Sequence, residues 1–200
     1  MSAAIHRHPR FAELRDRLRA HPEWFGTWNG TLFRFQTVDF PAPTDVLGGK
    51  GASWRGGRWN PPGLATLYGS TADTTALEEC RANDRYYGVE TKSPRLVIAI
   101  EAELTRVLDL TNPDIRRALD LTLTELGAED WRKLLAAGKE SFTQTLGRAV
   151  AAADGSGLLA RSAVVRRGIN VVVFPGVCAA DRLAVVEGAK LEKLGVRMKV

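Results

Sequence analysis

The chain has 200 residues, 44% hydrophobic and 26% charged, a composition typical of a globular domain large enough to need neither metal nor disulfide staples. Its two cysteines lack metal-ligand spacing, and no segment resembles a secretory signal or a membrane span, so we expect a cytoplasmic location. The net charge of +5 indicates either attraction to nucleic acid or phosphate-bearing ligands, or simply a surface with more arginine than acid.

The amino-terminal third predicts one helix, one strand and a long irregular stretch. Residues 10–20 have the spacing of a short amphipathic helix, and the alternating segment at residues 31–36 predicts a strand. Prolines and clustered glycines punctuate residues 41–63, where we expect an irregular loop. Loops of this length in compact domains are usually functional or disordered, and Trp54 and Trp59 argue against disorder.

A strand, a tight turn and a helix are predicted next. Residues 64–70 are apolar enough for a short buried strand. Thr71 or Asp73 can then cap a helix that extends to about Ala82.

Strands and helices are interspersed through the rest of the chain. Further strands are expected at residues 95–100, 106–110, 158–162 and 170–174. Helices are expected at residues 114–126, 129–137 and 143–153, followed by a mixed tail at residues 183–194. Asn112 and Pro113 suit the cap and the first turn of the first of these helices. Because regular βαβ units are missing from this pattern, we predict a single α+β domain with a mixed sheet core and surrounding helices.

Several common sites are excluded by the sequence. The glycine-rich run at residues 48–51 matches neither the Walker pattern nor a dinucleotide fingerprint, since no strand precedes it. The three histidines, His6, His8 and His21, all lie near the amino terminus. Neither a histidine base for a nucleophile nor a histidine-rich metal site is therefore expected in the body of the chain.

The informative motifs lie on both sides of the predicted strand at residues 64–70, with one more near the carboxyl terminus. They are residues 56–63 (GGRWNPPG), 67–70 (LYGS), 75–79 (TALEE) and 157–163 (GLLARSA). Their order, and the spacing of Arg58, Tyr68 and Glu79, resemble the RES family, which is named for its Arg, Glu and Ser. Members of that family are toxins of bacterial toxin–antitoxin pairs. The resemblance extends from about Phe33 to the final predicted helix.

The resemblance implies a fold, a substrate and a partner. The fold is similar to that of ADP-ribosyltransferases, NAD⁺ is a substrate rather than a recycled cofactor, and an Xre-like helix-turn-helix antitoxin occludes the site. Arg58, Tyr68, Glu79 and Ser162 take the family's active-site positions, and Arg34 resembles its additional substrate-binding arginine. Arg34, Arg58, Tyr68 and Ser162 are thus expected to bind NAD⁺, with no metal.

The same resemblance divides the chain into a helical extension at residues 1–30 and a RES domain at residues 31–200. It leaves the acceptor of the ADP-ribosyl group open, because the family includes members that use phosphate and members that modify a protein. Water, phosphate and a protein side chain are all candidates.

The chemistry of NAD⁺ cleavage suits these residue types. Nicotinamide leaves as a neutral molecule, so the reaction needs no general acid and no histidine. A carboxylate near the ribose can stabilise the developing oxocarbenium ion, which we assign to Glu79. The planar guanidinium groups of Arg34 and Arg58 match phosphate oxygens, and the ring of Tyr68 can stack on nicotinamide or orient the ribose. Ser162 would add a hydrogen bond to ribose or phosphate.

Each assignment has a structural alternative. Glu78 has Arg81 at the helical i+3 position, so Glu78 is the better candidate for a surface ion pair and Glu79 for function. Arg58 could instead cap loop carbonyls, and Tyr68 could be a core residue with a satisfied hydroxyl. Ser162 could satisfy a turn, and Ala160-Arg161 stand where many relatives have a proline before the serine.

Two other functions compete with NAD⁺ cleavage. The basic charge, with arginines interleaved between Trp54 and Trp59, is compatible with a nucleic-acid-binding or ribonuclease toxin. Against it, no nucleic-acid motif is present, so direct binding to nucleic acid is not expected. A catalytically silent protein that only binds the antitoxin is the third possibility, and its toxicity would survive loss of Arg58 or Glu79.

Overall fold

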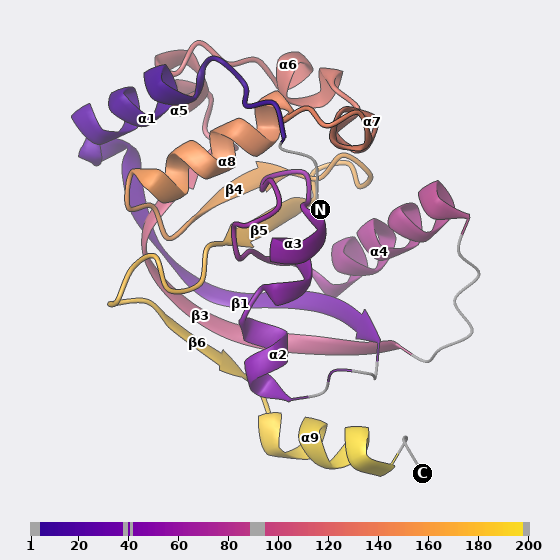
Figure 1. Cartoon of the computed structure of the whole chain (residues 1–200). Coiled ribbons are helices and arrows are strands. Elements are labelled where there is room, and N and C mark those ends of the chain that lie inside the picture. The colour runs from indigo at the N-terminus through magenta and orange to yellow at the C-terminus, as the bar shows by residue number, and fades with distance from the viewer. Residues whose placement is uncertain (1–4, 38–39, 41, 89–94, 198–200) are drawn as a thin grey trace.

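A six-stranded sheet forms the centre of the molecule (Figure 1). The computed structural model describes residues 5–37, 40, 42–88 and 95–197. The strands lie in the order β1–β2–β5–β4–β3–β6, and β1 also pairs with β3, so the first five close into a ring with β6 outside it. Their bounds are β1 (Phe25–Thr37), β2 (Leu67–Ser70), β3 (Arg95–Asp109), β4 (Gly157–Arg161), β5 (Ile169–Val173) and β6 (Arg182–Val185).

The longest element is the antiparallel pair of β1 and β3, which pairs Phe25 with Leu108 at one end and Thr37 with Arg95 at the other. The prediction of two separate strands at residues 95–100 and 106–110 was wrong, because β3 continues through the polar residues between them. Ala102 and Leu104 are buried while Glu101 and Glu103 are exposed, which is the alternation expected of a strand with one solvent-exposed face.

Helices cover the sheet and connect its strands. They are α1 (Phe11–Ala20), α2 (Pro43–Leu47), α3 (Lys50–Arg55), α4 (Asp73–Tyr87), α5 (Pro113–Ala118), α6 (Leu123–Ala128), α7 (Trp131–Ala136), α8 (Phe142–Ala152) and α9 (Gly188–Arg197), with a 3₁₀ turn at Pro22–Trp24. The helices predicted at residues 10–20, 129–137 and 143–153 are confirmed, as are the strands at residues 158–162 and 170–174, each within a few residues. A mixed sheet surrounded by helices confirms the α+β class.

Three predictions about helices were wrong. Residues 41–63 are not wholly irregular, because α2 and α3 form within them. The helix predicted at residues 114–126 is split into α5 and α6, since Asp120 adopts a left-handed conformation with φ 51° and Thr122 begins a new helix with a capping box to Glu125. Neither Thr71 nor Asp73 caps α4, because the N-cap position is Ala72, which has no side chain able to accept a hydrogen bond, and Asp73 is the first helical residue.

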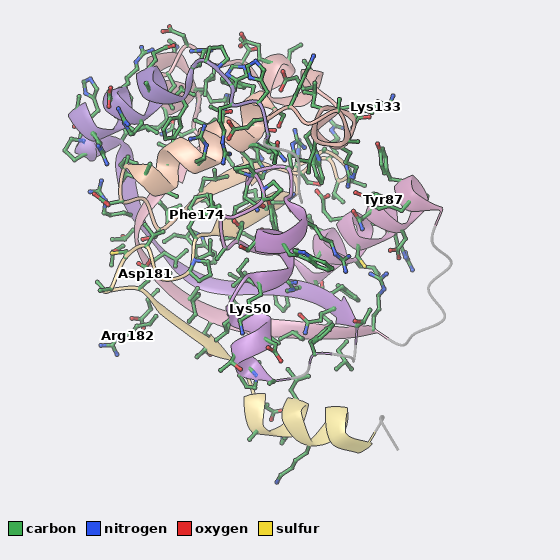
Figure 2. The ribbon with its side chains drawn as sticks, viewed as in Figure 1. Lys50, Tyr87, Lys133, Phe174, Asp181 and Arg182 are labelled. Carbon is green, nitrogen blue, oxygen red and sulfur yellow. The ribbon has the colours of Figure 1, made fainter. Side chains whose placement is uncertain are left out.

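The core has two parts, one on each face of β5. Val172 and Phe174 face the cluster beneath α1 and α8, whereas Val171 and Val173 face the cluster enclosed by β1 and β3. Phe174, labelled in Figure 2, is among the largest fully buried side chains. The alternation of β5 therefore separates two apolar layers, which explains why this strand is apolar on both faces.

The amino-terminal segment is attached to the body of the molecule. Helix α1 packs on α8, and the fully buried carboxylate of Glu140 accepts the His8 amide and pairs with Arg148 at 2.7 Å and Arg7 at 3.5 Å. The boundary that we proposed at residue 30 falls inside β1, and the division into residues 1–30 and 31–200 stays a proposal. Within the described residues, every helix is too short or too polar to span a bilayer.

Candidate active site

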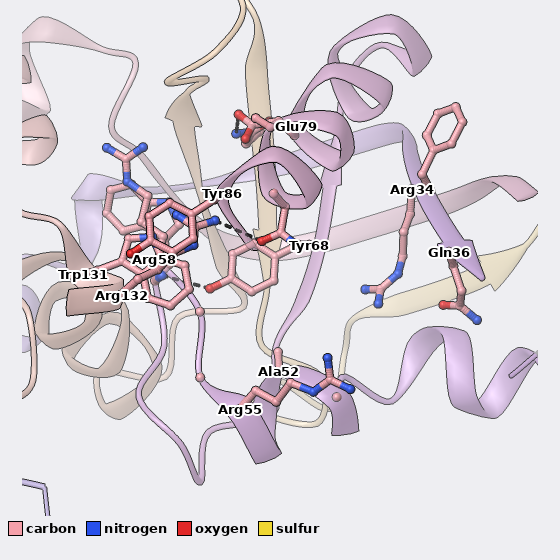
Figure 3. Close-up of a pocket in the computed structure, with 18 of the residues that line it drawn as sticks. Arg34, Gln36, Ala52, Arg55, Arg58, Tyr68, Glu79, Tyr86, Trp131 and Arg132 are labelled. Carbon is pink, nitrogen blue, oxygen red and sulfur yellow. Dashed lines mark hydrogen bonds between the residues drawn. The ribbon is translucent and has the colours of Figure 1, made fainter. Parts of the chain in front are cut away.

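A pocket of about 1070 Å³ opens between the end of β1, α3, α4 and α7 (Figure 3). Its volume is at the upper end of the usual range for small-molecule sites. Four of the five residues predicted from the sequence line it: Arg34, Arg58, Tyr68 and Glu79. Ser162 lies behind Glu79 and borders a smaller neighbouring pocket of about 340 Å³.

The loop that carries Arg58 is pinned to the core by its neighbour Asn60. The Asn60 side chain is fully buried and donates hydrogen bonds to the carbonyls of Ala52, Pro61 and Leu64. On the other side, the Gly57 carbonyl accepts a hydrogen bond from Gln144 of α8 at 2.9 Å. These bonds tie the backbone on both sides of Arg58 to buried parts of the fold.

Tyr68 forms hydrogen bonds to two residues of this loop. Its hydroxyl accepts from the Trp59 amide at 2.9 Å and donates to Asn60 Oδ1 at 2.8 Å, and burial raises its pKa. A Cβ on Gly57 would lie 2.5 Å from that hydroxyl, so only glycine allows the approach. The hydroxyl is satisfied within the protein, which leaves the ring of Tyr68 as the part that a ligand can contact.

We expect Tyr68→Phe to lower the free energy of unfolding by about 1–2 kcal/mol, because the buried Trp59 amide and Asn60 oxygen lose their partner. Urea unfolding followed by circular dichroism measures the change. An unchanged midpoint would mean that water replaces the hydroxyl and that the loop is not held by Tyr68.

Glu79 projects from α4 and is fixed by two donors. Its Oε1 accepts from Ser162 Oγ and from Asn170 Nδ2, both at 2.7 Å, and the Ser70 hydroxyl in turn donates to Asn170 Oδ1 at 2.8 Å. The Ser162 oxygen also accepts from the amides of Val164 and Val165. The carboxylate is thereby oriented by residues of β2 and β5 and by the residue that follows β4, and Glu79 lines the pocket.

The two adjacent glutamates, Glu78 and Glu79, lie in different surroundings. Glu78 forms the expected ion pair with Arg81 at 2.7 Å on the outer face of α4. Glu79 lines the pocket and Glu78 does not. The helical periodicity of α4 therefore separates a surface residue from a pocket residue.

Arg34 brings a buried positive charge to the far end of the pocket. Arg34 lies on the same face of β1 as Leu32, which is part of the core. Arg34 and Gln36, two residues further along that face, line the pocket (Figure 3). The Nε of Arg34 is buried without a hydrogen-bond partner among the described residues, and burial lowers the pKa of its guanidinium. A buried arginine in this condition favours an anionic ligand.

Arg58 lies on the opposite side of Tyr68 from Arg34 (Figure 3). One Nη of Arg58 donates to the Leu126 carbonyl at 2.7 Å. Part of the guanidinium therefore binds a backbone carbonyl, as the structural alternative for Arg58 expected. Burial lowers the pKa of Arg58, while the nearby negative charge of Glu79 raises it. Arg58 thus remains a cation beside the carboxylate, with further donors facing the pocket.

Sequence reasoning missed several residues of this site. Asn170 orients Glu79, and its only sequence signal is a polar residue in the otherwise apolar run of β5. Asn83 and Tyr86 line the pocket one and two helical turns after Glu79, a pattern that the periodicity of α4 could have indicated. Trp131 and Arg132 of α7 approach from another part of the chain, and no local pattern indicates them.

The pocket combines groups that suit a ligand carrying both negatively charged phosphates and a planar ring. Guanidinium groups lie on two sides, aromatic rings lie between them, and one positioned carboxylate faces the cavity. Such a set can bind phosphates, stack a planar ring and stabilise a developing cation.

Comparison with known proteins agrees with this geometry. A family model described as the RES domain matches residues 31–192. The NAD(+) phosphorylases MbcT of Mycobacterium tuberculosis (strain ATCC 25618 / H37Rv) and of Mycobacterium bovis (strain ATCC BAA-935 / AF2122/97) are each 33% identical over 141 residues, covering 66% of this chain and 72% of theirs.

A solved structure shares the fold. In the crystal structure of the M. tuberculosis MbcT–MbcA toxin–antitoxin complex, one chain superposes with a TM-score of 0.62 at 23% identity, covering 92% of this chain and 97% of that one. At this identity the likeness is one of fold.

Proposed function

This chain belongs to the RES domain family, and on that premise we propose that it is a toxin that cleaves NAD⁺ at the bond between nicotinamide and ribose. The observation that carries the proposal is one pocket that holds Glu79, fixed by Ser162 and Asn170, together with the guanidinium groups of Arg34 and Arg58. The Nε of Arg34 is buried without a partner among the described residues. The phosphorylase name of the mycobacterial relatives supports the choice of NAD⁺ as substrate.

In this proposal Glu79 stabilises the oxocarbenium-like ribose as nicotinamide departs. The electron pair of the C–N bond neutralises the nicotinamide nitrogen, so no proton donor is needed. Because the Glu79 oxygen is already oriented by two hydrogen bonds, little reorganisation is required during the reaction.

The other residues bind and position. Arg34 supplies a guanidinium to the pyrophosphate, and Arg58, which lies close enough to Glu79 to feel its charge, supplies one beside the ribose. The ring of Tyr68 offers a face to nicotinamide or ribose. Ser162 acts as a positioning residue for Glu79, since its hydroxyl is directed at that carboxylate and its oxygen holds the β4–β5 turn.

The experiment is to incubate the purified chain with NAD⁺ and to quantify nicotinamide by chromatography, with and without inorganic phosphate and cell lysate. We expect nicotinamide to accumulate in at least one condition. An intact NAD⁺ pool in every condition would refute the proposal.

We further propose that an antitoxin, a helix-turn-helix protein of the Xre-like type, covers the mouth of this pocket. Large apolar side chains are exposed around the mouth: Trp54 is 79% exposed, Phe40 62% and Tyr86 45%. Exposed apolar groups gathered at one rim are typical of a protein interface. A cytoplasmic location, where NAD⁺ and the antitoxin would meet the chain, belongs to the same proposal, and a protein acceptor of ADP-ribose stays an alternative to phosphate and water.

The nucleic-acid alternative has less support. It depended on Trp54 and Trp59 as stacking platforms between arginines. Trp59 is only 3% exposed and packs in the core, so it offers no face to a base.

A further inference from the structure

Two buried side-chain nitrogens have no hydrogen-bond partner among the described residues, and both belong to arginines of the same pocket. They are Nε of Arg34 and Nε of Arg132. Figure 3 shows these two side chains on opposite sides of Tyr68. Arg34 already has a role in the proposed function, whereas Arg132 has none.

Arg132 is held in place without being neutralised. Its guanidinium lies 4.5 Å from the ring centroid of Tyr86 and 4.4 Å from that of Trp131, and one Nη donates to Asn83 Oδ1 at 3.0 Å. Its neighbouring carboxylates have other partners, because Asp130 caps the backbone of α7 and Glu129 accepts the Phe142 amide. The group is therefore an oriented cation with unused donors.

Helix α4 places Arg132 relative to the carboxylate of Glu79, because Arg132 binds a residue of that helix. Asn83, which holds Arg132, is one helical turn from Glu79 on the same face of the helix. The charges of both Glu79 and Arg132 act on the pKa of Arg58, the first raising it and the second lowering it. Figure 3 shows Arg132 and Arg58 together on the side of Tyr68 opposite Arg34, so the two guanidinium groups share one end of the pocket that Glu79 also lines.

We propose that Arg132, together with Arg58, binds inorganic phosphate as the acceptor of the ADP-ribosyl group. This inference rests on the proposed cleavage of NAD⁺. The pyrophosphate is assigned to Arg34 on the other side of the pocket, so the unpartnered Nε of Arg132 and the remaining donors of Arg58 are left for a second anion. Guanidinium groups bind phosphate through parallel N–H···O bonds.

The transfer balances without a further reactant. An oxygen of HPO₄²⁻ forms a bond to the ribose carbon, the C–N bond breaks, and its electron pair passes to the nicotinamide nitrogen. The products are neutral nicotinamide and ADP-ribose carrying a phosphate monoester, which retains the proton of the incoming phosphate. Arg132 stabilises the phosphate as it approaches and takes no proton.

The test compares Arg132→Gln with the unaltered chain in steady-state assays, varying NAD⁺ and inorganic phosphate separately and resolving ADP-ribose from its phosphate ester. We expect the KM for phosphate to rise about tenfold or more, as for loss of a charge-assisted hydrogen bond, and the KM for NAD⁺ to change less than about threefold. The product ratio should shift towards ADP-ribose.

Arg132→Lys keeps the charge but loses the planar fork, and it should give an intermediate KM for phosphate. It also replaces Arg132→Gln if that variant fails to fold, as judged by circular dichroism. Arg117→Gln is the matched control, because Arg117 is an exposed arginine of α5 paired with Asp114 and lies outside the pocket; both KM values should stay unchanged.

Two outcomes would overturn the inference while leaving NAD⁺ cleavage intact. One is nicotinamide release that does not depend on phosphate, which would make water or a protein the acceptor. The other is a raised KM for NAD⁺ with an unchanged KM for phosphate, which would assign Arg132 to the dinucleotide. Absence of nicotinamide release by the unaltered chain would instead refute the proposed function itself.

Discussion

Glu79→Gln is expected to reduce the rate of nicotinamide release on the order of 10²–10³-fold, the usual cost of removing one positioned electrostatic group from a transition state. The amide oxygen of glutamine can still accept the hydrogen bonds from Ser162 and Asn170, so the geometry is retained and the charge is lost. Because the charge stabilises the developing ribosyl cation, kcat should fall more than the KM for NAD⁺ changes.

The adjacent residue provides the control. Glu78→Gln removes the same charge one residue away, from an outward-facing ion pair with Arg81 that is 38% exposed at the glutamate. Its rate should remain within about twofold of the unaltered chain, because exposed ion pairs contribute little. Equal losses in the two variants would show that Glu79 acts through the stability of α4 rather than through the reaction.

Arg34→Met should affect stability and activity in opposite directions. The guanidinium is partly desolvated and its Nε has no partner within the described structure, so an apolar side chain of similar length should raise the free energy of unfolding by about 1 kcal/mol. The same change should lower kcat/KM for NAD⁺ by about 30–100-fold, because the pyrophosphate loses charge-assisted hydrogen bonds.

Thermal unfolding and nicotinamide release test the two effects in one protein. Arg15→Met serves as the control, since Arg15 is a half-exposed residue of α1 paired with Asp16 and is not among the residues that line the pocket. It should change neither quantity measurably. If Arg34→Met lowers both stability and activity, then Arg34 is a structural residue and its assignment to substrate is wrong.

The candidate site was predictable where its residues follow one another along the chain. Arg58, Tyr68 and Glu79 belong to a loop, a strand and a helix in succession, and their side chains meet in one pocket. The pairing of Glu78 with Arg81 was also predictable, since residues at i and i+3 of a helix are always neighbours.

The contacts that orient the site could not be predicted in the same way. Asn170 reaches Glu79 only because β5 pairs with β2, the strand that precedes α4. Arg132 reaches Asn83 because the short helices between β3 and α8 return over α4. Both contacts join residues far apart in sequence, and no local periodicity encodes them.

The sequence by itself determined the α+β class, the helices α1 and α8, and the strands β4 and β5, because these depend on local hydrophobic period. Only the tertiary structure decided that β3 is continuous, that residues 114–126 form two helices, and that Arg34 and Arg132 lie in one pocket without carboxylate partners in the described chain. Pairing across the sheet and burial supply the free energy for these features, and both arise from contacts between distant segments.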